Sequence, residues 1–283
     1  MKKLISTLLV LLISFILAVI TYEPAPSPDK DTLAVHFLDV GQANCQVILL
    51  PDNKVMMIDA GNNDDSALIC NYLDSLGIST IDYLIGTHPH EDHIGSMDTV
   101  INNYSIGSVY IPDAQADTQS YRDFQKAMSR KSLGATLTSA GTVICENEMY
   151  KAVAVAPVYK YDDLNNMSIV IRLTYKDASF LFTGDAEEES ENDITDDISA
   201  DVLCVPHHGS STSLSDYFLN RVDPMYAVIS CGKNNDYGHP HWETMEKLEN
   251  DDIVTYRTDT MGTVICTTLG NGANDYYWER HYD

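Results

Sequence analysis

Short apolar runs alternate with turn residues along most of the chain, and their spacing predicts a mixed α/β protein. Runs of about four to eight residues rich in Val, Ile, Leu and Phe are typical of strands. Predicted strands cover residues 33–39, 45–50, 55–59, 83–87, 108–111, 153–156, 168–175, 179–182, 202–205, 227–230, 253–256 and 263–267. Helical periodicity predicts helices over residues 66–76, 92–102, 118–131, 214–220 and 242–248.

The order of these elements predicts the layers of the fold. Strands come in consecutive groups separated by single helices, in both halves of the chain. This pattern favours two sheets packed face to face with helices outside, a four-layer αββα sandwich of the α/β class. With 283 residues, 44% of them hydrophobic, the chain can bury a substantial core. We expect one large domain over residues 33–283.

The first 21 residues have a different pattern. Lys2 and Lys3 precede an apolar stretch from Leu4 to Ile20, and the following YEPAPSPDK cannot continue a helix. The stretch would span roughly 25 Å as a helix, near the lower limit for crossing a bilayer, and no clear cleavage site follows. The sequence therefore predicts a cleaved signal peptide or an N-terminal membrane anchor over residues 1–21, then a linker over residues 22–32.

This leader predicts where the protein acts. With both lysines on the cytoplasmic side, the domain would lie outside the cell, secreted or anchored to the outer face of the cytoplasmic membrane. Only the N-terminal segment would contact the membrane. The sequence leaves the oligomeric state open.

The net charge and the cysteines restrict the ligands and cross-links that the protein can have. A formal charge of −25 opposes binding to nucleic acid, which depends on lysine and arginine displacing counterions. The acidic run over residues 185–201 predicts a solvated helix and loop. Six cysteines occur without a CxxC pair, which argues against zinc held by thiolates and leaves disulfide pairing open.

Seven of the nine histidines fall in three loops, each after an apolar run. In THPHEDHIG, residues 87–95, Pro89 favours an extended backbone, so His88 and His90 would project to one side and share an ion. Asp92 and His93 begin the next helix and would serve a second ion nearby. Imidazole and carboxylate without thiolate favour zinc, manganese or iron, and we expect one or two divalent ions, zinc or manganese.

Other strand ends carry matching chemistry. ASFLFTGDA ends in Asp185, whose carboxylate would bridge two cations, and VPHHGS contributes His207 and His208. Asp59, after another strand, would orient a ligand histidine. In YGHPHW, His239 and His241 would protonate a leaving group or bind substrate; the alternative is that they only build a turn.

Six stretches carry a family resemblance: VHFLDVGQANCQVILL, MMIDAG, NNMSIVIRL, FLFTGDA, VPHHGSSTS and NDYGHPH. In this order, over residues 34–268, they resemble the metallo-β-lactamase superfamily, and within it the extracellular domain of ComEC-type competence proteins. The resemblance implies the αββα sandwich. It also implies metal ligands at His88, His90, Asp92, His93, Asp185 and the histidine pair, of which His207 is preferred over His208. We expect catalytic roles for Asp92, Asp185, His239 and His241.

The sequence also departs from the superfamily pattern. Most superfamily hydrolases have a further histidine between the first loop and the bridging aspartate, and none lies between His93 and His207. ComEC-type domains offer asparagine there, here Asn165 and Asn166, so we expect weak binding of the ion at His88 and His90. GQANC replaces the usual GQGDS, with Asn44 in place of an aspartate.

These features together predict an exported metal-dependent hydrolase. A bound divalent ion lowers the pKa of its water molecule to about 7 and makes hydroxide available near neutral pH. The resemblance implies a phosphodiester substrate, in a nucleic acid or a cell-wall polymer. Two alternatives stay open: a hydrolase of lactones or other esters, and a non-catalytic metal-binding accessory in DNA uptake or cell-wall binding.

Overall fold

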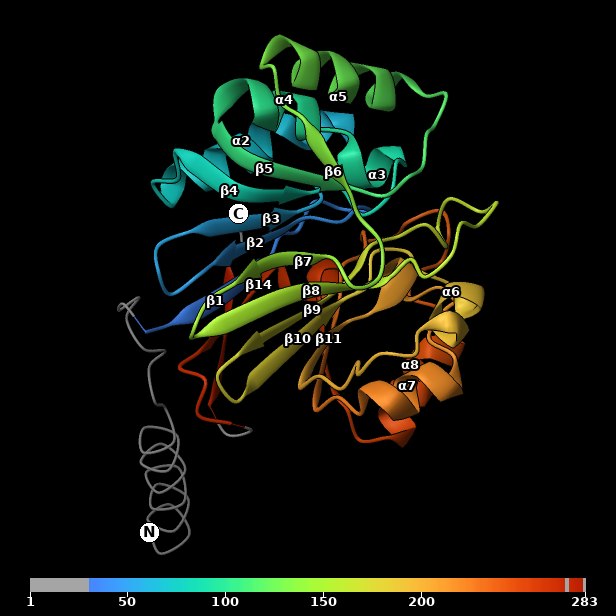
Figure 1. Ribbon diagram of the computed structural model, residues 1–283. Helices are drawn as coiled ribbons and strands as arrows, with labels where there is room; N and C mark the ends of the chain where they lie inside the picture. The colour runs from blue at the N-terminus through green and yellow to red at the C-terminus, as the bar shows by residue number, and fades with distance from the viewer. Residues whose placement is uncertain (1–30, 273–274, 282–283) are drawn as a thin grey trace, which may run out of the picture.

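Two mixed β-sheets pack face to face and carry helices on both outer faces (Figure 1). The computed structural model describes residues 31–272 and 275–281. Within them, the predicted four-layer αββα sandwich is confirmed. The predicted leader over residues 1–21 and most of the predicted linker lie outside the described residues.

The first sheet contains the strands of the N-terminal half of the chain together with the last two strands, and the second sheet contains the strands between them. In spatial order, the first sheet contains β15 (Tyr276–His281), β14 (Thr263–Thr268), β1 (Leu33–Phe37), β2 (Gln46–Leu49), β3 (Val55–Ile58), β4 (Thr80–Ile85), β5 (Ser105–Ile111) and β6 (Ala135–Leu137). The second contains β13 (Val254–Arg257), β12 (Tyr226–Ile229), β11 (Val202–Cys204), β10 (Ala178–Phe182), β9 (Val170–Tyr175), β8 (Tyr150–Ala156) and β7 (Val143–Glu146). All the strands predicted from the sequence are present, with ends shifted by a few residues.

The helices cover the two outer faces. Those on the first sheet are α2 (Ser66–Ser75), α3 (Glu91–Ile94), α4 (Met97–Asn103) and α5 (Gln119–Arg130). Those on the second are α6 (Glu188–Asp193), α7 (Asp216–Val222) and α8 (Trp242–Asn250). Three short helical turns complete the description: η1 (Asn63–Asp65), η2 (Pro206–Gly209) and α9 (Thr258–Met261). In the described ranges, no helix is long and apolar enough to cross a membrane.

Three apolar cores hold these layers together. Between the sheets, Phe37 of β1 meets Phe182 of β10 with ring centroids 6.3 Å apart. Under the helices, Phe124 of α5 and Phe218 of α7 anchor the two outer cores. Full burial of such a side chain contributes roughly 1.5–3 kcal/mol, so the sandwich provides a rigid support for the loops at its edge.

The helix predicted over residues 92–102 is wrong as one continuous element. The backbone N–H of Gly95 donates to Gly61 O at 2.8 Å, and that of Ser96 donates to Ala60 O at 3.1 Å. A Cβ on Gly95 would lie 2.4 Å from the backbone of Asn62. The loop after β3 therefore packs against this point of the chain, and the helix divides into α3 and α4.

The acidic run is also less solvated than predicted. It forms α6 as expected, but Glu191 is fully buried. Its carboxylate accepts hydrogen bonds from Leu214 N at 2.6 Å and Ser215 N at 2.9 Å. Glu191 thus fixes the start of α7 to α6. All six cysteines, which lie in the described part of the chain, are unpaired.

Candidate metal centre

The polar loops meet at one edge of the sandwich because parallel strands end there together. β4 is parallel to β3 and β5, and β10, β11 and β12 are parallel to one another. The loops after β4, β10, β11 and β12 line a cavity of about 360 Å³. Its walls include Gln42, His90, Glu91, Asp92, Asn165, Asp185, His207, His208, Tyr237 and His239.

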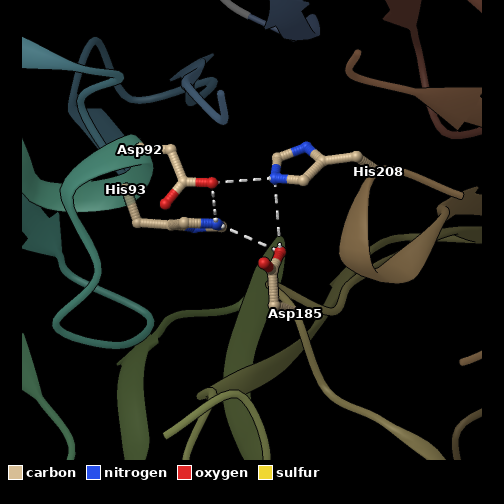
Figure 2. Close-up of side chains that lie close together, drawn as sticks. All are labelled: Asp92, His93, Asp185 and His208. Carbon is tan, nitrogen blue, oxygen red and sulfur yellow. Dashed lines mark hydrogen bonds and ion pairs between the residues drawn. The ribbon is translucent and has the colours of Figure 1, made fainter. Parts of the chain in front are cut away.

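Two aspartates and two histidines converge at the base of this cavity. Asp92, His93, Asp185 and His208, here called the four-residue cluster, each place one potential ligand atom within 4.8 Å of the others (Figure 2). His93 Nε2 lies 3.1 Å from Asp185 Oδ1, and His208 Nε2 lies 3.3 Å from Asp92 Oδ2. Such a set of imidazole and carboxylate donors suits zinc or manganese.

Asp59 fixes the ring of His93 from below. Both side chains are fully buried, and His93 Nδ1 lies 2.7 Å from Asp59 Oδ2. The Asp59 carboxylate also accepts from Thr87 N and Oγ1, each at 2.8 Å, and from Asn44 Nδ2 at 2.9 Å. Because Nδ1 donates to Asp59, Nε2 faces the cluster. This is the orienting contact expected of Asp59.

His208 is oriented in the same way, by a backbone group. Its Nδ1 donates to Ser230 O at 2.8 Å, which leaves Nε2 toward the two aspartates. His207, the preferred member of the pair, lies outside the four-residue cluster: its Nδ1 contacts Glu187 Oε1 at 3.0 Å. The geometry therefore favours His208 over His207 at this position, which reverses our preference.

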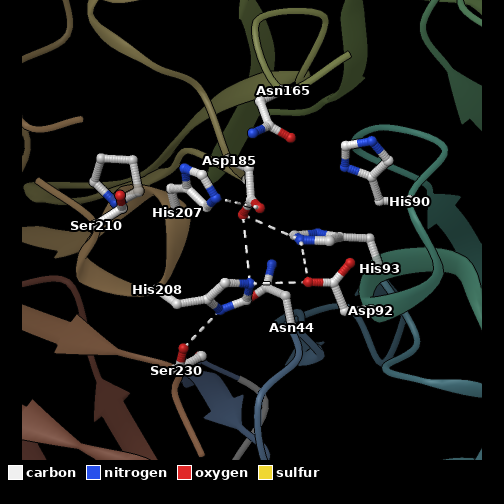
Figure 3. A network of polar contacts seen from close by, with 12 residues as sticks. Asn44, His90, Asp92, His93, Asn165, Asp185, His207, His208, Ser210 and Ser230 are labelled. Atoms are coloured by element: carbon white, nitrogen blue, oxygen red, sulfur yellow. Dashed lines mark hydrogen bonds and ion pairs between the residues drawn. The ribbon is translucent and has the colours of Figure 1, made fainter. Parts of the chain in front are cut away.

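A second group of imidazoles faces the other oxygen of Asp185. His88 Nε2 and His207 Nε2 lie 4.0 and 3.7 Å from Asp185 Oδ2. His90 Nδ1 approaches His88 Nε2 to 3.0 Å, so these two rings share one side, as their spacing predicts. Figure 3 shows Asp185 between His207, His93 and His208, the arrangement that a bridging carboxylate requires.

The two asparagines have different surroundings. Asn166 is buried, and its Oδ1 accepts from Glu187 N at 3.1 Å and Ser190 N at 3.3 Å, at the start of α6. Asn165 lines the cavity, and its buried Oδ1 makes no hydrogen bond within the described residues. Asn165 is therefore the asparagine placed to approach a cation.

The pKa values of the buried histidines shift in different directions. Burial opposes the charged form of His93, but the carboxylates of Asp185, Asp59 and Asp92 outweigh burial and raise its pKa well above the usual value. Burial also opposes the charged form of His208, but Asp185 and Asp92 outweigh burial and raise its pKa. Burial, with the neighbouring His93, holds the pKa of His88 well below the usual value. His88 is therefore an uncharged imidazole, the form that binds metal.

The aspartates of the cluster respond in the opposite sense. Burial raises the pKa of Asp185, but His93 and His208 outweigh it, and the pKa is lowered well below the usual value. The pKa of Asp92 is lowered in the same way, mainly by His93. Both carboxylates are thus ionised at neutral pH, the state in which they bind cations.

Backbone strain marks the loop that carries the histidine pair. His207 has φ 51° and His208 has φ 54°, in the left-handed region that non-glycine residues rarely adopt. Each such residue costs of order 1–3 kcal/mol and persists only where its surroundings impose it. In this loop the strain turns His208 toward the cluster and His207 toward Glu187.

The two histidines of the third loop lie in different surroundings. His239 lines the cavity, where burial and the rings of His208 and His207 lower its pKa to about 4, so its charged form is scarce at neutral pH. His241 Nδ1 accepts from Ser211 N at 2.9 Å, and Nε2 contacts Tyr237 O at 3.1 Å. His241 therefore fits the turn-building alternative, because both ring nitrogens are used within the loops.

The cluster passes a simple test for a bound cation. His93 Nε2 is buried and makes no hydrogen bond in the described part of the chain, although two ionised carboxylates lie within 4 Å. Once its proton is displaced, this nitrogen joins the ionised oxygens in a donor set that a divalent ion completes. The residues present fit the ion.

Several residues at the site carry no sequence signal of their own. Gln42, Tyr237 and Glu187 line or support the cavity, and Ser230 contributes only its carbonyl group. Gln42 lies in GQANC, where the departure from the family pattern is at Asn44 and not at the glutamine. Tyr237 and Glu187 could have been found only by their position in the sequence, because each lies two residues from a predicted site residue, His239 and Asp185.

Comparisons with known proteins agree with this geometry. The model of the metallo-beta-lactamase superfamily matches residues 38–233. ComE operon protein 3 of Bacillus subtilis is 27% identical over 250 residues, which cover 81% of this chain and 32% of that protein. Recombination protein 2 of Haemophilus influenzae is 29% identical over 244 residues, which cover 83% of this chain and 29% of that protein. The chain spans about a third of the length of these curated relatives.

Solved structures show the same fold. Igni18, a metallo hydrolase from Ignicoccus hospitalis, superposes with a TM-score of 0.51 at 13% identity, covering 83% of this chain and 98% of that one. At this level of identity the similarity supports the architecture alone.

Proposed function

The chain belongs to the metallo-β-lactamase superfamily, and we propose on this premise that it is a metal-dependent hydrolase of phosphodiesters. One observation carries the proposal: the two carboxylate oxygens of Asp185 face different pairs of imidazoles. Oδ1 faces His93 and His208, and Oδ2 faces His88 and His207. A carboxylate in this position can bridge two cations and leave room for water in the cavity above it.

The residues at the site would have different roles in holding and orienting the ions. Asp92, His93, Asp185 and His208 would hold one divalent ion, and His88 and His90 with Asn165 a second. Zinc or manganese bound there would supply an acidified water and polarise the scissile group. Asp59 keeps His93, and Ser230 O keeps His208, with Nε2 toward the ion. Asp185 would orient the attacking water.

The choice of a phosphodiester rests on the relatives, which include Recombination protein 2 of Haemophilus influenzae and Competence protein ComA of Neisseria gonorrhoeae. Charge restricts the size of the substrate. The chain carries a formal charge of −25. Lys126, one of the basic residues on α5, is itself paired with Asp123 at 2.8 Å. Long duplex DNA would be repelled. We therefore propose a short or single-stranded phosphodiester, met outside the cytoplasmic membrane as the leader predicts.

Turnover of chromogenic phosphodiesters tests the proposal. The full chain loaded with manganese or zinc should hydrolyse methyl p-nitrophenyl phosphate, and Asp185→Asn should lower kcat/KM at least about 100-fold, since a bridging ligand is removed. Asp251→Asn removes the same charge from an exposed position after α8 and should leave kcat/KM unchanged. Hydrolysis of p-nitrophenyl acetate or a lactone alone would reassign the substrate class.

Asn165 favours the alternative of a non-catalytic accessory. Its amide oxygen is a weaker ligand than an imidazole, so the second cation would bind less tightly. It predicts stoichiometric metal with no turnover of phosphodiester, ester or lactone. Metal content and turnover measured on the same sample separate the two functions.

A further inference from the structure

The loop that carries His239 is fixed against two neighbouring loops by close backbone contacts. A Cβ on Gly232 would lie 2.6 Å from Gln42 N, and a Cβ on Gly209 would lie 2.6 Å from Pro240 Cβ. Only glycine allows these approaches. His239 is therefore held at the rim of the cavity by contacts that a larger residue would break.

Gln42 determines which nitrogen of His239 carries the proton. Gly232 N donates to Gln42 Oε1 at 2.9 Å, and a backbone N–H can only donate, so this atom of the amide is its oxygen. The other end, Nε2, lies 3.2 Å from His239 Nδ1 and can only donate. His239 Nδ1 therefore accepts, and the hydrogen of the neutral ring lies on Nε2.

The loop itself also restrains the ring. Asn235 Nδ2 donates to His239 O at 2.6 Å, and His239 N donates to Asn235 Oδ1 at 3.0 Å. Tyr237 stacks on the imidazole with centroids 5.6 Å apart and an interplanar angle of 23°. The ring of His208 lies 6.3 Å from that of His239, at an interplanar angle of 24°. The position of the Nε2–H group is thus fixed beside the cluster.

We propose that His239 donates a hydrogen bond from Nε2 to a phosphoryl oxygen of the substrate as an uncharged group, and that Gln42 is the positioning residue that fixes this tautomer. The inference rests on the proposed function. His239 lines the same cavity as Asp185 and His208, and its Nε2 contacts no acceptor among residues 31–272 and 275–281. A preorganised donor beside the scissile group stabilises charge that develops on its oxygens.

The tautomer can be measured without metal or substrate. Two-bond ¹H–¹⁵N correlation spectra of the full chain with ¹⁵N-histidine distinguish the tautomers, and His239→Ala identifies the signal. The wild-type ring should show the Nε2–H pattern. Gln42→Glu keeps an acceptor for Gly232 N but presents a carboxylate to Nδ1, so it should produce an Nδ1-protonated pattern. Gln42→Met, which offers no donor, should give a mixture.

A double-mutant cycle tests whether Gln42 acts through His239. With methyl p-nitrophenyl phosphate and manganese, His239→Ala should lower kcat/KM by roughly 100-fold, the loss typical of one such donor. Gln42→Glu should lower it comparably in the wild-type background and by less than about 2-fold when His239 is already alanine.

Independent effects in the cycle, an Nδ1–H pattern in the wild type, or an unchanged pattern in Gln42→Glu would each overturn this inference while wild-type turnover remains. Absence of turnover in the wild-type chain would overturn the proposed function and the donor role together. The two failures are therefore distinguishable.

Discussion

His93 Nδ1 and Asp59 Oδ2 lie 2.7 Å apart in the interior of the protein, where neither side chain contacts solvent. Asp59 follows β3 and His93 lies on α3, so this pair joins two loops of the first sheet. The contact holds the imidazole with Nε2 toward Asp185. The geometry of the cluster therefore depends on a carboxylate that does not itself face the cavity.

Asp59→Asn should weaken metal binding. An amide offers His93 a poorer acceptor and can reverse the ring, and loss of such an orienting contact typically costs about 10- to 100-fold in metal affinity. Competition with a chelating dye measures the affinity. Asp82→Asn is the matched control, because Asp82 accepts from Val55 N at 2.9 Å but lies on β4 away from the cluster. Equal affinities in the two variants would contradict the prediction.

Metal affinity should rise with pH. The raised pKa values of His93 and His208 mean that the metal-free cluster holds protons that an ion must displace. We expect proton release on binding, measured by titration calorimetry in buffers of different ionisation enthalpy. Binding without proton release at pH 6.5 would count against this protonation state.

The same shifts predict how the stability of the metal-free protein depends on pH. A histidine whose folded pKa is raised stabilises the fold fully below its unfolded value of about 6.5, and this contribution is lost as pH rises through the folded pKa. The gap in Tm between metal-loaded and metal-free protein should therefore widen as pH rises above about 6.5. Thermal scans at fixed metal concentration check this, and a constant gap would contradict it.

The two cation positions should differ in strength. Asn165 offers one amide oxygen, which is a weaker ligand than an imidazole, so the ion at His88 and His90 should dissociate first. Asn165→Ala should weaken this second ion by about 10-fold or more and leave the first unchanged. Manganese titration followed by electron paramagnetic resonance resolves the two steps. Two equal sites in the wild type would rule out this difference.

Glu191 should matter for stability more than for metal. Glu191→Ala removes the acceptor of two backbone N–H groups at the start of α7, and each unsatisfied buried donor costs about 1–3 kcal/mol. We expect a loss of roughly 2–5 kcal/mol in the free energy of unfolding. Urea denaturation measures it. Glu188→Ala, at an exposed position on the same helix, is the control and should change little.

The sequence predicted the elements whose faces are buried. The core strands and long helices have apolar patterns that tertiary packing reinforces, and they lie where expected. β6, β7 and β15 were missed because they lie at sheet edges and have no alternating apolar pattern. All three residues of β6 are exposed, β7 buries two adjacent residues, and β15 buries only its first. Without an apolar face, a short edge strand has no periodicity to detect.

The candidate site was also only partly predictable from the sequence. Histidines and aspartates after apolar runs were identifiable, because ligand chemistry at a strand end has few other uses. The choice between His207 and His208 was not, because the left-handed backbone of both residues decides which ring joins Asp92 and His93 in the four-residue cluster. The bond between Gln42 and Gly232 joins residues 190 positions apart, and one partner is a backbone group that every residue has.

The four-residue cluster draws on both layers of strands. Asp92 and His93 follow β4 of the first sheet, whereas Asp185 and His208 follow β10 and β11 of the second. An ion bound to all four would cross-link the two halves of the sandwich at their rim. Chelation should then increase local opening between the sheets, and a protease would cut the rim loops of the depleted protein sooner than those of the loaded one.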